Sequence, residues 1–188
     1  MYKEGIPLVV CDIETAGLTL EHDIIQIAAV VVSTKDWSEK ESFEVKLKFD
    51  SAKAEATALK VNGYTAEAWK DAVTPLQGLG RLSKLFERHR SATRISARGN
   101  AYTVAIAAGY NGSFDSERIM HQSRKLSLFQ AVDPRFLDVM QLAFWKQLGL
   151  DSYKLVKVAE HFQLSTEKAH DALADVRITI EVMKKLLS

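Results

Sequence analysis

The sequence predicts a mixed α/β layer fold, in which helices pack on a central sheet whose first three strands form an antiparallel meander. Two apolar, β-branched segments near the start, residues 8–13 and 24–32, are typical of buried strands. Helical patterns dominate the second half of the chain, and the two element types alternate between these regions. Strands first and helices later favour a sheet that helices cover.

The first half of the chain is predicted to hold the meander and the first helices. Residues 43–49 (FEVKLKF) alternate apolar and polar side chains, as expected for a half-buried third strand. Residues 52–72 have a mostly helical pattern with a turn at Asn62-Gly63. Between Leu76 and Arg90, apolar side chains recur at helical spacing, which predicts an amphipathic helix.

The second half begins with a short apolar strand over residues 104–108 and a helix over residues 116–126. A last short strand is expected near residues 135–139. Three helices complete the prediction, at residues 140–148, 153–162 and 172–187. No repeat, low-complexity segment or flexible linker interrupts this order, so residues 1–188 are expected to form a single domain.

Composition is that of an ordinary globular protein. The 188 residues include 25 basic and 24 acidic side chains, a net charge of +1. Nucleic-acid-binding domains often have a pI above about 9, so charge alone does not indicate one. The longest apolar run, Ile24 to Val32, is broken by Gln26 and is far shorter than the ~20 residues that span a bilayer. No membrane partner is expected.

One cysteine and the N-terminal sequence bear on the compartment. Cys11 lies alone in an apolar run, so no intrachain disulfide is possible, and a small buried hydrophobe is favoured over a reactive thiol. The first residues, MYKEGIPLVVCDIE, lack the apolar stretch and cleavage site of a signal peptide. We therefore expect a soluble, cytoplasmic protein.

The segment VVCDIETAGL (residues 9–18) places two acids at the end of an apolar strand. Asp12 and Glu14 are two residues apart, so in a strand their side chains point to the same face. Adjacent, partly buried carboxylates repel each other, and a divalent cation removes the conflict. An all-oxygen site suits Mg²⁺ or Mn²⁺. Two solvated acids at a strand end are the alternative for this segment alone.

The segment AAGYNGSFDSERI (residues 107–119) is predicted to be a short strand, a turn and the start of a helix. Asp115 would lie in the first helical turn, where the helix dipole favours an acid whatever its function. Phe114 is most simply a core anchor, and Asn111 is most simply a turn or capping residue. By itself this segment favours a structural interpretation.

The segment AHDALADVRITI (residues 169–180) contains a histidine and an acid five positions apart. In one continuous helix they would be separated by about 140° around the axis. His170 and Asp175 can face a common point only if the histidine precedes the helix and the acid lies in its first turns. Asp171 fits this arrangement as the N-cap of a helix that begins at Ala172. Alone, a histidine before a helix is more often a capping or surface residue.

In this order the three segments resemble the DEDDh branch of the DnaQ-like 3′→5′ exonucleases, which includes the proofreading subunit of bacterial DNA polymerase III, ribonuclease T and oligoribonuclease. DIETAGL is similar to the first motif, NGSFD to the second and HDALAD to the third, including the histidine that distinguishes this branch. The resemblance covers residues 8–187, with VNGYTAEAW and SYKLVKVAEHF also familial. It implies a ribonuclease-H-like fold with a mixed five-stranded sheet flanked by helices.

The resemblance also implies the chemistry. Asp12, Glu14 and Asp175 would hold one divalent ion, Mg²⁺ with Mn²⁺ as a substitute, and Asp12 would bridge to a second ion held by Asp115. Two such ions balance four carboxylates and clamp an in-line displacement at phosphorus. His170 would be the general base, so activity should rise between roughly pH 5.5 and pH 7.5 around an ordinary imidazole pKa of about 6.5.

Contacts to the terminal nucleotide follow from the same resemblance. The backbone of Thr15 would reach the 3′-hydroxyl, Leu18 would wedge against the last base, and Asn111 is a further candidate contact. A core residue at a turn is the competing interpretation of Leu18. The family's first motif often reads Thr-Thr-Gly, whereas this chain has Ala16 in the middle. That change removes a possible hydroxyl contact but no metal ligand.

The residues leave substrate and partners open. The 3′ ends of single-stranded DNA are favoured, and RNA ends or short oligoribonucleotides are the alternative, because no contact to the sugar 2′-hydroxyl is identifiable. A catalytically inactive nucleic-acid-binding module is a third interpretation, for which the intact motifs give no support. The last predicted helix ends beside Ser188 and leaves no tail to tether a polymerase, so a free-standing exonuclease is expected.

Basic and aromatic side chains outside the motifs are interpreted structurally. Between Arg81 and Arg98 lie six basic residues and one acid, a pattern that could follow phosphates but is more typical of a solvated helix face and loop. Three tryptophans are expected to be core or turn anchors rather than a base-stacking platform: Trp37, Trp69 and Trp145. Histidines outside the third motif have no acidic partner at motif spacing.

Overall fold

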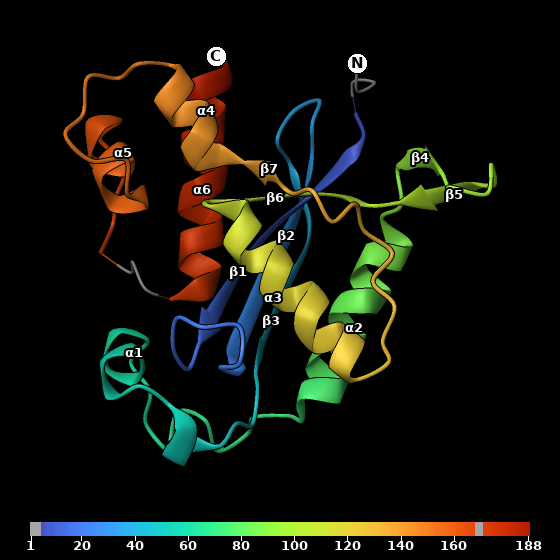
Figure 1. Ribbon diagram of the computed structural model, residues 1–188. Helices are drawn as coiled ribbons and strands as arrows, with labels where there is room; N and C mark the ends of the chain where they lie inside the picture. Colours follow the sequence, from blue (N-terminus) through green and yellow to red (C-terminus); the bar gives the residue numbers. More distant parts are fainter. Residues whose placement is uncertain (1–4, 168–170) are drawn as a thin grey trace.

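The computed structural model describes residues 5–167 and 171–188 and contains a five-stranded mixed sheet in the order β3-β2-β1-β6-β7 (Figure 1). The first three strands form an antiparallel meander, whereas β6 runs parallel to β1 and β7 runs parallel to β6. The bounds are Pro7–Thr15 (β1), Ile24–Ser33 (β2), Glu39–Lys46 (β3), Ile106–Gly109 (β6) and Leu137–Asp138 (β7). The predicted mixed sheet is confirmed.

Helices cover both faces of this sheet (Figure 1). The bounds are Ala56–Val61 (α1), Pro75–Arg88 (α2), Gly112–Lys125 (α3), Val139–Trp145 (α4), Leu155–His161 (α5) and Ala172–Leu187 (α6). One face packs on α2 and α3, and the other packs on α4, α5 and α6. Among the described residues, no helix combines the length and the apolar character needed to cross a membrane.

The central strand β1 contributes to both apolar layers because successive side chains point to opposite faces. Val9 and Cys11 belong to the layer under α2 and α3, and Cys11 is buried as predicted. Leu8 and Val10 belong to the layer under α4, α5 and α6. The same alternation places the side chains of Asp12 and Glu14, the next two residues on this second face, near α6 at the end of the strand.

Two predictions in the first half are wrong in their bounds. The third strand begins at Glu39, which pairs with Val32 directly after a tight turn, and it ends at Lys46. Residues 52–72 form α1, a short 3₁₀ helix (Ser51–Lys53) and turns instead of a mostly helical segment. Helical propensity is overridden there by burial of Trp69, whose indole nitrogen donates to the carbonyl oxygen of Ile25 at 3.1 Å.

A two-stranded hairpin, β4 (Ala92–Ile95) and β5 (Ala101–Val104), projects from one side of the molecule (Figure 1). The hairpin was not predicted, because its exposed residues show no apolar alternation. Three arginines of the basic stretch are paired with acids of this chain: Arg88 with Glu41, Arg90 with Glu87 and Arg94 with Asp133. These pairs agree with the interpretation of the stretch as a solvated surface.

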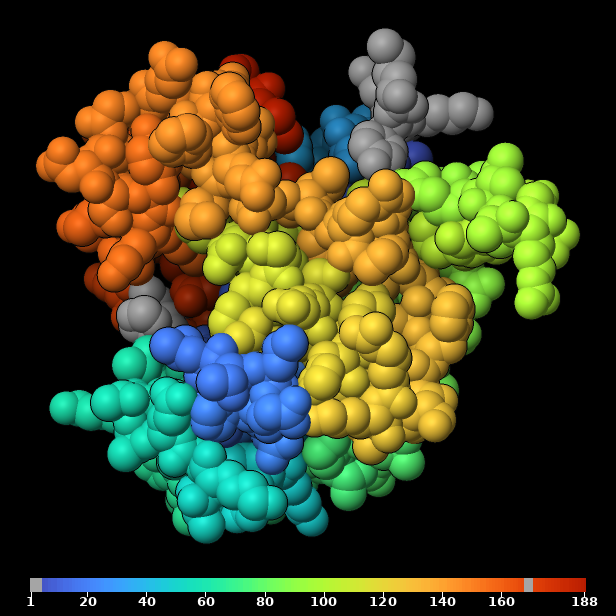
Figure 2. All heavy atoms as spheres, viewed as in Figure 1, coloured from blue at the N-terminus to red at the C-terminus, as the bar shows by residue number. Residues whose placement is uncertain are grey.

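The segment between β1 and β2, residues 16–23, lies on the surface between the α1 region and α3 (Figure 2). Its backbone is joined to the chain before α1, since the Glu55 amide donates to the carbonyl oxygen of Ala16 at 2.8 Å. The segment thereby connects the first predicted motif to the α1 region.

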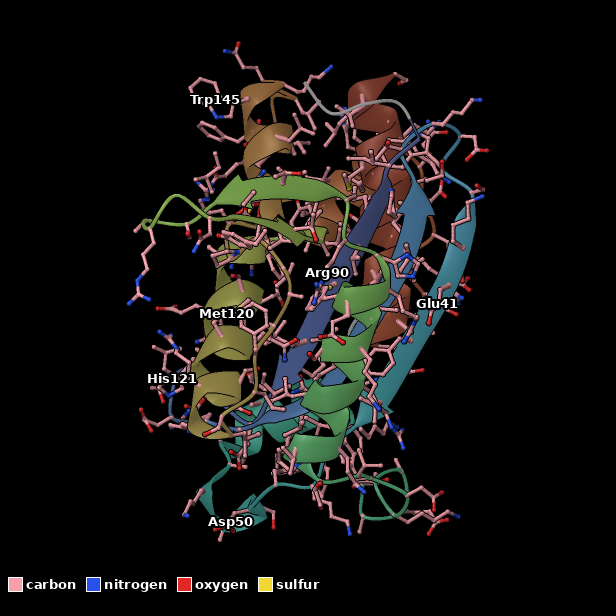
Figure 3. The ribbon with its side chains drawn as sticks, turned by 90° about the vertical axis from the view of Figure 1, so that its right-hand side faces the viewer. Glu41, Asp50, Arg90, Met120, His121 and Trp145 are labelled. Carbon is pink, nitrogen blue, oxygen red and sulfur yellow. The ribbon has the colours of Figure 1, made fainter. Side chains whose placement is uncertain are left out.

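The tryptophans differ in their environments. Trp69 is buried, and Trp37 occupies the turn before β3 with φ +58° and packs against the core, so both are anchors as predicted. Trp145 is 77% exposed at the end of α4, pointing away from the rest of the molecule (Figure 3). The anchor interpretation is therefore wrong for Trp145, because the C-terminal turn of α4 extends beyond the core.

Candidate metal centre

Three carboxyl groups meet where the end of β1 faces the start of α6. Asp12 and Glu14 share the β1 face whose earlier residues pack under α6. Asp175 lies in the first turn of α6, and the side chain of Asp171 caps this helix by accepting from the Ala174 amide at 3.0 Å, as predicted. One oxygen from each of the three carboxyl groups lies within 4.8 Å of the others.

Asp115 approaches the same end of β1 from the opposite layer. It lies in the first turn of α3, is 3% exposed, and its Oδ1 accepts a hydrogen bond from the Ile13 amide at 3.1 Å. The pairing of β1 with β6 ends at Val10, so this carboxylate satisfies a β1 amide beyond the paired stretch. Among the described residues, the group with oxygens within 4.8 Å does not include Asp115.

Gly109 makes the close approach of α3 to β1 possible. A Cβ atom at this position would lie 3.1 Å from the carbonyl oxygen of Cys11, 3.1 Å from Cα of Gly112 and 3.3 Å from Oδ2 of Asp115. Such contacts with backbone atoms are too short to relieve without moving the start of the helix. The glycine at the end of β6 therefore sets the position of Asp115.

Burial and mutual repulsion disfavour ionisation of the acids. Burial, followed by the charges of Asp115 and Glu14, raises the pKa of Asp12 well above its usual range. Burial, followed by the charge of Asp175, raises the pKa of Glu14 from 4.5 to about 8. Burial raises the pKa of Asp115 to about 7, against the opposing effect of the Ile13 hydrogen bond. A nearby cation would favour the ionised forms of all four groups.

The donor set fits a hard divalent ion. Carboxylate oxygens are the ligands that Mg²⁺ and Mn²⁺ prefer, and three of them converge from two elements that packing holds rigidly. Asp12, Glu14 and Asp175 could hold one ion, and the adjacent carboxyl of Asp115 could contribute to a second.

The structure also locates the predicted nucleotide contacts. Thr15 is buried, and its hydroxyl donates to the carbonyl oxygen of Gly17 at 2.8 Å. Leu18 is 73% exposed, so its interpretation as a core residue is wrong: the segment turns outward before the side chain can reach the core. Asn111 occupies the turn before α3 with φ +61°, and its side chain makes no helix-capping bond. The predicted base, His170, lies outside the described residues.

A cavity of about 330 Å³ adjoins the acids, and its lining residues include Glu14, Thr15, Leu18 and Phe114. The side chain of Phe114 is partly buried against the core, as predicted, and also forms part of this wall. The opposite wall comes from α1 and the following residue, Asn62, whose amide donates to the carbonyl oxygen of Thr15 at 2.9 Å.

Sequence reasoning missed the side chains that hold these walls in place, Asn62 and Arg118. Arg118 is buried on α3 and donates to the carbonyl oxygen of Leu18. A signal was present, since Arg118 begins a series of polar side chains at helical spacing on the helix that was predicted for residues 116–126.

The family model described as Exonuclease matches residues 9–183, which include all three motifs, α3 and most of α6. The chain belongs to the exonuclease family. The resemblance to DnaQ-like 3′→5′ exonucleases of the DEDDh branch, and the prediction of an exonuclease-type enzyme, are thereby confirmed at the level of the family. This family implies divalent metal ions, and the acidic cluster described above meets that requirement.

Two curated relatives of this exonuclease chain are PolC-type DNA polymerases III. The protein from Caldanaerobacter subterraneus subsp. tengcongensis is 27% identical over 201 residues that cover 100% of this chain and 13% of the polymerase. The protein from Clostridium perfringens is 29% identical over 181 residues that cover 94% of this chain and 11% of the polymerase. The chain thus spans only a small fraction of these relatives.

Solved exonuclease structures have the same fold. E. coli exonuclease I in complex with a dT13 oligonucleotide matches with a TM-score of 0.73 at 18% identity, covering 97% of this chain and 41% of that one. The nuclease domain of 3′hExo, a DEDDh family member bound to rAMP, matches with a TM-score of 0.75 at 13% identity, covering 100% of this chain and 94% of that one. The predicted ribonuclease-H-like fold is confirmed.

Proposed function

We propose that this chain is a metal-dependent 3′→5′ exonuclease that releases nucleoside monophosphates from the 3′ end of a DNA strand. The observation that carries the proposal is the convergence of Asp12, Glu14 and Asp175, with oxygens within 4.8 Å, beside a cavity of about 330 Å³. An acidic site next to a nucleotide-sized cavity can place the terminal phosphodiester directly at the metal ligands.

Each acid has a defined part in this proposal. Asp12, Glu14 and Asp175 hold one divalent ion, and Asp12 with Asp115 holds a second, Mg²⁺ being expected and Mn²⁺ able to substitute. When bound, the ions supply charge neutralisation and activate water for an in-line displacement. The carboxylates supply the negative charge that retains the ions, and their fixed positions on β1, α3 and α6 orient the phosphate between them.

Proton transfer is assigned to His170. As a neutral imidazole it accepts the proton from the attacking water while the bond from phosphorus to the 3′-oxygen breaks. Its sequence position, directly before the N-cap of α6 at Asp171, is next to the helix that carries Asp175. This placement supports the role, because the base must reach the same phosphate as the metal ligands.

The terminal nucleotide is expected to occupy the cavity beside Glu14. The backbone of Thr15 contacts the 3′-hydroxyl, and the exposed side chain of Leu18 wedges against the last base. Asn111, at the turn before α3, is a further candidate contact.

The choice of DNA rests on the curated relatives, which are named DNA polymerases. RNA is the second candidate substrate. Its support is the structurally similar nuclease domain of 3′hExo, which was solved with rAMP bound. A cytoplasmic location and the lack of a stable polymerase partner remain predictions. Purification of the native protein would test the second, and a polymerase that copurifies in fixed ratio would overturn it.

Digestion of 5′-labelled single strands tests the proposal. Matched DNA and RNA are incubated with Mg²⁺, with Mn²⁺ or with EDTA, and an Asp175→Asn variant controls for contaminating nucleases. We expect a ladder of single-nucleotide steps that requires metal and disappears in the variant, with DNA degraded faster. Metal-dependent cleavage of RNA but not of DNA would show that the substrate is RNA. No cleavage of either strand would favour a nucleic-acid-binding module.

A further inference from the structure

Arg118 is a buried cation on α3 that the proposed chemistry does not use. Its exposed fraction is 6%, and a guanidinium is costly to bury unless its donors are satisfied. Nη2 donates to the carbonyl oxygen of Leu18, and Nη1 donates to that of Phe114 at 3.3 Å. Cζ also lies 3.4 Å from the centre of the Phe114 ring. The guanidinium therefore joins two walls of the cavity that come from distant parts of the chain.

Further side chains on the same face of α3 contact the segment formed by residues 16–23. They follow the guanidinium at i+3, i+4 and i+7: His121, Gln122 and Lys125. Nε2 of Gln122 donates to the carbonyl oxygen of His22 at 3.0 Å. Nζ of Lys125 lies 2.8 Å from a carboxylate oxygen of Glu21. The stripe thus contacts this segment at several points along its length.

These contacts differ in how much they stabilise the segment. Glu21 is largely exposed, so its ion pair with Lys125 and its contact with His121 on α3 (Figure 3) stabilise little. Arg118 and Gln122 are buried, and a buried donor that loses its acceptor carries the full cost of desolvation. The segment is anchored at its start by burial of Ala16, and at Leu18 it is held through a backbone carbonyl group, since the side chain of Leu18 is exposed.

The held segment is one wall of the cavity beside Glu14. The facing wall is held by another contact, in which Asn62 donates to the carbonyl oxygen of Thr15, and the Glu55 amide joins this wall to Ala16 of the segment. Figure 2 shows the segment between α3 and the α1 region. Loss of the Arg118 contact would release the part of the segment at Leu18, and the width of the cavity at that point would no longer be set.

We propose that Arg118 is a positioning residue that holds Leu18 and Phe114 in the arrangement that receives the terminal nucleotide. The inference rests on the proposed function, because it assigns the cavity to that nucleotide. Arg118 acts through these two residues and does not touch the substrate. A preformed cavity avoids the entropy of ordering a surface segment at each binding event.

The first test compares Arg118→Met with Arg124→Met, an arginine on the exposed side of the same helix. In Arg118→Met we expect kcat/KM for a short strand to fall roughly 10- to 100-fold, mostly through KM, because small misplacements at a reacting centre have effects of this size. Backbone amides of residues 17–22 should also exchange hydrogen faster. Arg124→Met should change neither. Unchanged exchange and kcat/KM within twofold of the wild type would overturn the proposal.

A double-mutant cycle separates positioning from general support of the fold. If Arg118 acts through Leu18 and Phe114, Arg118→Met should lower kcat/KM by a smaller factor in a Leu18→Ala background than in the wild type, and the remaining loss is the part that acts through Phe114. Equal losses in both backgrounds would contradict the positioning role. Arg118→Lys retains the charge and can satisfy one carbonyl, so it should be intermediate, and it replaces Arg118→Met if that variant fails to fold.

Binding of a nucleoside 5′-monophosphate in the presence of Mg²⁺ needs no turnover. We expect Arg118→Met to weaken this binding about tenfold or more, measured by titration calorimetry. If the wild type binds the monophosphate but releases no nucleotide from strands, the proposed function fails while the positioning role is still decided. If the wild type binds it and both arginine variants bind it equally well, the positioning role fails.

Discussion

In the absence of metal the protein should lose stability as pH rises from 5.5 to 8.0, because the acidic site then ionises without a counter-charge. The pKa of Glu14 is raised in the folded state from 4.5 to about 8. A carboxyl with a raised folded pKa stabilises the protein fully below its unfolded pKa and loses that contribution as pH rises through the folded value. At about 1.36 kcal/mol per pH unit, Glu14 alone lowers the free energy of unfolding by about 3 kcal/mol across this interval.

The assay is thermal unfolding in EDTA and in saturating Mg²⁺ at several pH values. For a chain of this size the loss corresponds to a fall in Tm of roughly 6–12 °C in EDTA. Mg²⁺ binds the ionised carboxylates, so the difference in Tm between Mg²⁺ and EDTA should grow with pH.

The matched control is Glu14→Gln, which cannot ionise at this position. The Tm of this variant should depend less on pH in EDTA. Subtracting its pH dependence from that of the wild type cancels the contributions of groups that titrate elsewhere in the chain. Equal pH dependences of wild type and variant would refute the reasoning, since the raised pKa of Glu14 would then not be a property of the fold.

The remaining predictions concern the base, the packing of α3 and the basic surface. His170→Ala should lower kcat roughly 10²- to 10⁴-fold, and the wild-type chemical step should accelerate between roughly pH 5.5 and 7.5; a flat profile in single-turnover experiments would argue against this base. Gly109→Ala should lower the free energy of unfolding by about 1–3 kcal/mol in denaturant titrations and reduce activity by moving Asp115; a fully stable, fully active variant would contradict the packing argument. Replacing Arg94 and Arg98 with Glu should leave KM within about twofold, because Arg94 already pairs with an acid; a large rise in KM at low salt would assign the hairpin to substrate binding.

Apolar periodicity was sufficient to predict the antiparallel meander and the helices that cover it, whereas the mixed five-stranded sheet was implied by the family resemblance. The meander and both flanking layers follow from residues 8–13 and 24–32 and from the later amphipathic helices, because each pattern demands a buried face. The region from residue 52 to 72 was mispredicted because alanine-rich propensity is weak, and burial of Trp69 outweighs it. The hairpin after α2 was not predicted, because β4 and β5 are largely exposed and bury few apolar side chains on either face.

The acids of the site were predictable where secondary structure fixes direction. The spacing of Asp12 and Glu14 in a strand, and the N-cap before the helix of Asp175, determine where these side chains point. Contacts that depend on tertiary packing were not predictable. No local pattern reveals that Arg118 reaches Leu18, one hundred residues earlier, or that Leu18 is exposed.

Histidines outside the motifs illustrate the same limit. Spacing in the sequence gave them no acidic partners, yet His89 lies 2.8 Å from Glu41 and His22 lies 3.6 Å from Glu55. The acids come from other elements of the fold, so motif spacing is the wrong criterion for such pairs. These contacts are distinct from the acidic cluster on β1 and α6.

The first bond that is broken distinguishes an exonuclease from an endonuclease. A single-stranded DNA carries one ³²P atom in its last phosphodiester bond, and a covalently closed circle of related sequence serves as the control. With Mg²⁺ we expect labelled nucleoside 5′-monophosphate as the first product, no early internal fragments and an intact circle. Cleavage of the circle, or labelled fragments longer than one nucleotide at the earliest times, would contradict a 3′→5′ exonuclease at this site.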